Sequence, residues 1–102
     1  MQLINYKKIG YIQSLKSGKK ISGNNLSKEI VRRKNILSSL GVKSSDKIII
    51  MHGGEPDFFS DLFSLWDIGC CAICLNPGTT VNELDNICDF VKPKMILHNG
   101  NM

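Results

Sequence analysis

The chain has 102 residues, of which 42% are hydrophobic and 22% are charged, proportions typical of a globular chain and not of a disordered one. That length allows one domain or part of one, and no apolar run approaches the roughly 18 residues that a membrane-spanning helix needs. The N-terminus lacks an apolar stretch followed by small residues, so we expect no secretory signal and a location in the cytoplasm.

The net charge of +4 is unevenly distributed, with +9 over residues 1–47 and −5 over residues 48–102. A basic half can bind nucleic acid, but Lys28, Arg32, Arg33 and Lys34 fall on the polar side of a predicted helix, without aromatic side chains between them. We therefore expect no nucleic-acid partner. These residues are interpreted as a solvated helix face, or as the complement of the acidic second half or of a partner.

The elements predicted along the chain alternate after a first helix. Residues 1–15 show a weak helical pattern and Ser17 to Lys20 a turn, so residues 1–20 are assigned as an N-terminal extension. A helix is predicted from about 23 to 40, with Ser22 or Asn24 as its cap and Gly41 at its end. Residues 46–51 are typical of a buried parallel strand, and a helix with Pro56 in its first turn then runs to Gly69.

The second half of the pattern repeats this alternation. A strand is predicted over residues 70–75, with both faces covered. Thr80 and Glu83 form a capping box for a helix that ends before Pro93, and a last strand follows. The predicted inner face of that helix consists of the apolar residues Val81, Leu84, Ile87, Cys88 and Val91. The last strand is predicted over Met95 to Leu97. The predicted fold class is α/β, a parallel βαβαβ unit preceded by a helix, over residues 21–102.

Four cysteines raise the question of a metal or redox site. Cys71 and Cys74 have ligand spacing, with Cys70 adjacent and Cys88 further on. In an extended strand, however, Cys71 and Cys74 fall on opposite faces, so we interpret them as strand residues and expect neither a metal site nor a disulfide.

Two turns could bind ligands at the carboxyl edge of the predicted sheet. The glycines Gly53 and Gly54 precede a helix, but Glu55 and Asp57 place negative charge where a phosphate would bind, so a tight turn explains the glycines better. His52 and His98 both follow strands and could share a site, although a polar strand-end role is favoured for each. The Asn25 sequon lies inside a helix and is discounted.

The order of these elements over residues 21–98 resembles the opening of the adenylate-forming superfamily, which includes acyl-CoA synthetases, peptide-synthetase adenylation domains and luciferases. The segments that carry the resemblance are Ile21-Ser22 with Leu26, Leu40-Gly41-Val42 with Asp46-Lys47, Gly54-Glu55-Pro56-Asp57, Gly69 to Pro77, Glu83-Leu84, and Val91 to Leu97. The chain departs from the family pattern at Ser44-Ser45, Gly53-Gly54 and Cys74.

The resemblance implies an ATP- and Mg²⁺-dependent ligase that joins a carboxylic acid to AMP, releases pyrophosphate and usually passes the acyl group to a thiol. That chemistry requires a Ser/Thr/Gly-rich phosphate loop with a lysine, a magnesium-binding carboxylate, a ribose-binding aspartate and a mobile lysine. We identify none of these motifs, because Thr79-Thr80 is isolated and caps a helix. We therefore assign no catalytic, cofactor-binding or metal residue and expect an inactive scaffold that needs the remainder of the enzyme.

One other interpretation of the chain stays open, and a further one is disfavoured by specific residues. The chain could be a stand-alone binding or regulatory module completed by a second chain. A receiver-type or flavodoxin-like domain is disfavoured, because Asp46 precedes its strand and no aspartate follows one. The open strand edges also predict self-association.

Overall fold

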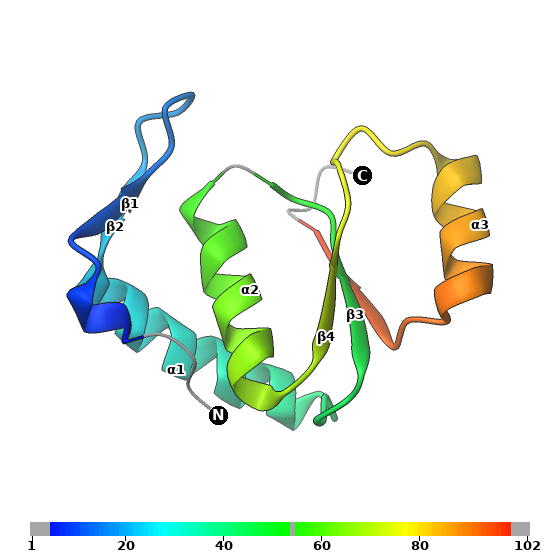
Figure 1. The fold of residues 1–102 in the computed structure, drawn as a ribbon, viewed down its shortest axis with the longest axis horizontal. Coiled ribbons are helices and arrows are strands. Elements are labelled where there is room, and N and C mark those ends of the chain that lie inside the picture. The colour runs from blue at the N-terminus through cyan, green and yellow to red at the C-terminus, as the bar shows by residue number, and fades with distance from the viewer. Residues whose placement is uncertain (1–4, 54, 99–102) are drawn as a thin grey trace.

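The computed structural model of the protein describes residues 5–53 and 55–98 (Figure 1). A short antiparallel hairpin comes first, formed by β1 (Tyr11–Gln13) and β2 (Lys20–Ser22) after a 3-10 turn, η1 (Tyr6–Lys8). The remaining elements are α1 (Gly23–Ser39), β3 (Lys47–Ile50), α2 (Pro56–Ile68), β4 (Cys71–Cys74), α3 (Val81–Val91) and β5 (Met95–Leu97). This order confirms the predicted α/β class and the parallel βαβαβ unit preceded by a helix.

The three-stranded parallel sheet has the order β4-β3-β5, so β3 lies at its centre. Ile48, Ile49 and Ile50 of β3 are fully buried, as a central strand covered on both faces requires. The two crossovers place α2 and α3 on opposite sides of the sheet, and α1 crosses beneath α2 (Figure 1). Leu65 of α2 and Leu37 of α1 pack with Ile48 and Ile50 in the main core.

The helix boundaries follow the predicted capping residues closely. The Ser22 side chain accepts a hydrogen bond from Asn25 N at 3.2 Å, and Thr80 accepts one from Glu83 N at the same distance. Gly69 ends α2 in the left-handed conformation, with φ of 96°, and Pro56 occupies the first turn of that helix. A residue with a Cβ would be strained at Gly69, which explains the glycine.

The weak helical pattern predicted for residues 1–15 is wrong for most of its described part. Only Tyr6–Lys8 is helical, and Tyr11–Gln13 is a strand paired with Lys20–Ser22; residues 1–4 lie outside the described chain. Tyr6, Ile9 and Ile12 form a second apolar cluster with α1 and α2, so tertiary contacts determine the conformation there. The hairpin spans position 20, and the division between an extension and residues 21–102 stays a prediction.

One prediction about packing is wrong within the described chain, and another holds only in part. β4 is an edge strand whose terminal residues Cys71 and Cys74 are exposed, so it is not covered as a central strand would be. The face of α3 predicted to be inner is half-buried at Leu84, Ile87, Cys88 and Val91, but none of these residues is fully buried and Val81 is 83% exposed. The sequences of β4 and α3 have the apolar patterns of elements packed against other parts of a protein. The described residues cover these two elements only in part.

Within residues 5–53 and 55–98, every helix is too short or too polar to span a membrane.

Candidate functional site

His52 and His98 line one pocket at the carboxyl edge of the parallel sheet. His52 follows β3 and His98 follows β5, and because these strands are parallel neighbours, their ends meet on the same side. The pocket has a volume of about 210 Å³ and is also lined by Arg33, Asp57 and Asp61. The two histidines thus lie close enough to line one pocket, and a shared functional site stays a prediction. The contributions of Arg33 and Asp61 were not predicted from the sequence.

Asp61 connects the histidine of β3 to the arginine of α1. Its Oδ2 lies 2.6 Å from His52 Nε2, and its Oδ1 accepts a hydrogen bond from Arg33 Nη1 at 2.7 Å. The three side chains are 9%, 14% and 17% exposed for His52, Asp61 and Arg33, so the chain of contacts is largely shielded from water. An aspartate placed in this way fixes the orientation of the imidazole ring, as second partners of functional histidines do.

Arg33 is already neutralised by three carboxylates. Besides Asp61, it contacts Glu29 through Nε and Asp57 through Nη2, each at 2.8 Å. Burial works to lower the pKa of Arg33, but the hydrogen bonds with Glu29 and Asp61 outweigh it and raise that pKa above its ordinary value. Arg33 therefore acts as a cross-link between α1 and α2 and is poorly placed to bind a phosphate.

The pocket and its surroundings do not fit a nucleoside triphosphate. Ligand pockets usually measure roughly 300–1,000 Å³, and this one is smaller. The adjoining start of α2 carries Asp57, and Glu55 accepts hydrogen bonds from Ser14 and Ser17 at 3.4 and 2.7 Å. These carboxylates occupy the helix N-terminus that a phosphate would otherwise approach.

The glycines of the same turn have no steric explanation in the described chain. Gly53 is not in the left-handed region, and a Cβ built there would meet no atom within 4 Å. Gly54 lies outside the described residues, so its part in the predicted tight turn is untested.

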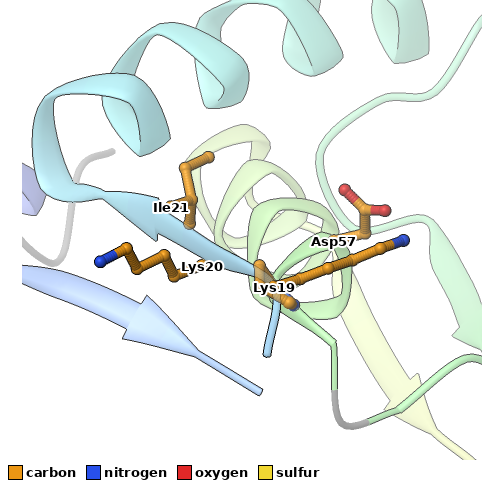
Figure 2. Close-up of a pocket in the computed structure, with 5 residues that line it drawn as sticks. Lys19, Lys20, Ile21 and Asp57 are labelled. Carbon is orange, nitrogen blue, oxygen red and sulfur yellow. The ribbon is translucent and has the colours of Figure 1, made fainter. Parts of the chain in front are cut away.

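A second pocket of about 300 Å³ lies between the hairpin and the start of α2, lined by Lys19, Lys20, Ile21, Pro56 and Asp57. Figure 2 shows Lys19 reaching along α2 in the direction of Asp57, whereas Lys20 points away from that helix. Lys20 Nζ instead lies 5.4 Å from the centre of the Tyr11 ring. The pocket brings residues of opposite charge, Lys19 and Asp57, together between the hairpin and α2.

Cys71 and Cys74 lie in β4 and Thr80 lies at the start of α3, the elements that the sequence predicts for them. All four cysteines are free thiols, and Cys70 Sγ donates a hydrogen bond to Lys43 O at 3.2 Å. Within residues 5–53 and 55–98, no three His, Cys, Asp or Glu side chains are grouped so that they could hold a metal ion. Thr80 caps α3, as predicted, with Glu83 completing the capping box.

The basic residues of α1 only partly form the solvated face that the sequence suggested. Lys28 and Arg32 are exposed, whereas Arg33 is directed at α2 and Lys34 Nζ lies 3.6 Å from Asp67 of α2. Arg32 and Arg33 together lower the pKa of Glu29 to about 2 through hydrogen bonds and charge. The alternative interpretation, that this basic segment complements the acidic second half, is thus confirmed for Arg33 and Lys34.

The arrangement of α1, α2 and the parallel sheet also occurs in solved structures of larger proteins. Solved structures with this arrangement include apo MatB from Rhodopseudomonas palustris, with a TM-score of 0.74 and 23% identity over 82% of this chain. The N-terminal subdomain of NpsA from Klebsiella oxytoca gives a TM-score of 0.77 and 13% identity over 84% of this chain. The four-domain nonribosomal peptide synthetase AB3403, bound to AMP and glycine, gives a TM-score of 0.73 and 22% identity over 78% of this chain.

These similarities establish the fold that the sequence resemblance implied. The chain spans 17% of MatB, 23% of the NpsA subdomain and 6% of AB3403, so it corresponds to a small part of such proteins. No protein-family model matches the sequence, and no curated protein does.

Proposed function

We propose that this chain is the N-terminal segment of an ATP-dependent acid ligase, which forms an acyl-adenylate and then usually a thioester. The observation that carries the proposal is the shared arrangement of β4-β3-β5 with α1 and α2, supported by the succession of sequence segments from Ile21 to Leu97. The peptide synthetase among these structures binds AMP, and the chain spans only a small share of it and of MatB.

Within that enzyme, the role proposed for this chain is that of a framework. Its carboxyl-edge pocket is small and acidic, and Arg33 is already paired, so the groups that hold ATP and Mg²⁺ must come from the remainder of the enzyme. We place this enzyme in the cytoplasm, without a nucleic-acid partner.

The proposal is tested on the gene and on two purified proteins. The reading frame is sequenced beyond codon 102, where we expect a Ser/Thr/Gly-rich loop followed by lysine. The product of the whole frame and the chain of residues 1–102 are then assayed for acid-dependent exchange of labelled pyrophosphate into ATP. Exchange is expected only from the longer product, and its lysine-to-alanine variant in the loop is the matched control.

A second candidate function is a binding or regulatory module completed by a separate chain, which the uncovered face of α3 favours. A reading frame that ends at Met102 would support this module and overturn the first proposal. Pyrophosphate exchange by residues 1–102 alone would contradict the framework role.

A further inference from the structure

One end of the molecule is basic and partly apolar. We define the basic hairpin surface as Lys16, Lys19, Lys20, Tyr11 and Leu15. Residues 6–22, which contain it, include five lysines and no acidic residue. Leu15 is 100% exposed and Tyr11 is 60% exposed, so apolar area accompanies the charge. The neighbouring carboxylates are occupied, since Glu55 accepts from Ser17 and Asp57 contacts Arg33.

The other end has the opposite charge with the same mixed character. We define the acidic helix surface as Asp85, Asp89 and Val81 of α3, which recur every four residues along the helix. This helix contains three acidic residues and no basic one. Val81 is 83% exposed, and both aspartates are exposed as well. Asp85 and Asp89 are four residues apart and so lie on one helix face.

The two surfaces are far apart within one molecule. The hairpin and α3 lie at opposite ends of the longest axis, which measures 38 Å (Figure 1). That separation greatly exceeds the Debye length of about 8 Å at physiological ionic strength, so neither surface neutralises the other within the chain. An antiparallel pair of molecules, in contrast, can place each hairpin against the α3 of its partner.

We propose that a second copy of this chain binds in this way, and that the result is a reciprocal dimer with two identical contacts. In each contact, the lysines of the basic hairpin surface face Asp85 and Asp89, while Leu15 and Tyr11 cover Val81. Twofold symmetry makes the two contacts equivalent and closes the assembly. Charge complementarity fixes the antiparallel register and makes the association sensitive to salt.

The association is measured by analytical ultracentrifugation of the chain of residues 1–102 over a wide concentration range. At low ionic strength we expect the average mass to rise from monomer to dimer. At 1 M salt, where the Debye length is about 3 Å, the dissociation constant is expected to increase at least roughly tenfold. Mass that stays at the monomer value at every concentration and both salt levels overturns the proposal.

Charge exchange identifies the two surfaces. The variants Lys16→Glu/Lys20→Glu and Asp85→Lys/Asp89→Lys are each expected to weaken dimerisation by roughly tenfold or more, because attraction becomes repulsion. Mixed in equal amounts, the two variants are expected to recover dimerisation, since every hairpin again faces an α3 of opposite charge. The control Lys28→Glu/Lys43→Glu changes the net charge equally at exposed sites outside both surfaces and should retain the wild-type dissociation constant.

Circular dichroism confirms that each variant is folded, and recovery in the mixture provides a readout that a folding defect would not produce. Dimerisation that persists in both double variants contradicts the proposal and indicates pairing through the open edges of β4 or β5 instead. Failure of the mixture to dimerise, when each variant is folded, also contradicts it.

Discussion

Gly23 is a residue whose role becomes visible only in three dimensions. A Cβ built at Gly23 would lie 1.9 Å from Ile9 O and 2.6 Å from Tyr6 O, so the backbone of η1 and its following residue packs directly against the start of α1. We expect Gly23→Ala to lower the free energy of unfolding by about 1–3 kcal/mol, because backbone atoms must move to admit the methyl group.

Urea unfolding measures this change, and Gly53→Ala is the matched control. A Cβ at Gly53 meets no atom within 4 Å, so its substitution should alter stability by less than about 0.5 kcal/mol. Equal effects of the two substitutions would show that the close approach of η1 to α1 does not restrict which side chain position 23 can accommodate.

Tyr6 provides a pH-dependent test of the same region. Its hydroxyl donates a hydrogen bond to Asp67 Oδ1 at 2.6 Å, and its ring stacks on Phe63 with 5.4 Å between ring centres. Burial, followed by the hydrogen bond and the charge of Asp67, raises the pKa of Tyr6 above its ordinary value of about 10. The protonated phenol is therefore favoured in the folded state, and its contribution is complete below pH about 10.

As the pH rises above about 10, Tyr6 ionises in the unfolded chain before it does so in the folded one, and stability is lost. We expect the wild-type protein to lose more stability between pH 9 and pH 11 than Tyr6→Phe, measured by urea unfolding at each pH. At neutral pH, Tyr6→Phe should cost about 1.5–3 kcal/mol, because a hydrogen bond to a charged group is removed. The exposed Tyr11→Phe should change neither quantity.

At the scale of elements, Arg33 cross-links α1 to α2. We expect Arg33→Ala to lower the free energy of unfolding by about 2–3 kcal/mol, since it leaves Asp61 and Glu29 partly buried without their shared cation. Arg32→Ala is the neighbouring control. Arg32 is 59% exposed and pairs with Glu29 at the surface of α1, so its removal should cost about 0–0.5 kcal/mol. Similar losses from both would argue against the cross-link.

Substitution of the helix caps distinguishes α1, which contributes to the core, from α3, which is peripheral. Ser22→Ala and Thr80→Ala each remove a capping hydrogen bond, worth about 1 kcal/mol to its helix. α1 contributes Leu26, Ile30 and Leu37 to the core, whereas α3 buries no residue. We therefore expect Ser22→Ala to lower global stability, and Thr80→Ala to increase amide hydrogen exchange in α3 alone. A global loss from Thr80→Ala would show that α3 is coupled to the core.

The elements after residue 22 could be predicted from the sequence because local signals mark their ends. Ser22, Pro56, Gly69 and Thr80 act within one helical turn, and the apolar run of β3 identifies a central strand without further information. β1 and β2 have three residues each and lack such signals, so their pairing depends on the contact of Tyr6 with α1 and α2. Local patterns do not contain that information.

The candidate site divides in the same way. The positions of His52 and His98 after parallel strands were sufficient to predict that they meet at one edge of the sheet. Asp61 and Arg33 reach that pocket only because α1 packs on α2, a distance in sequence of 28 residues between the two side chains. No spacing in the sequence predicts that these two side chains meet. How far α3 is buried likewise depends on residues outside that helix.

For the molecule as a whole, the charges and pockets determine what the isolated chain can bind. In a calorimetric titration with ATP and Mg²⁺, we expect residues 1–102 to show no binding tighter than millimolar. The carboxyl-edge pocket measures about 210 Å³, and the carboxylates of Asp57 and Asp61 already hold Arg33. A triphosphate would therefore meet negative charge without an unpaired guanidinium to offset it.

Arg33→Met supplies a control for this argument, because it frees both carboxylates and makes the pocket more acidic. Binding of ATP should remain weaker than millimolar in that variant, and Asp57→Asn should not raise it to micromolar, since the pocket stays too small for the nucleotide. Micromolar affinity in the wild-type chain, lost on Arg33→Met, would instead identify Arg33 as a phosphate ligand. The framework role would then be wrong, because the chain would hold by itself one of the groups that the ligase reaction requires.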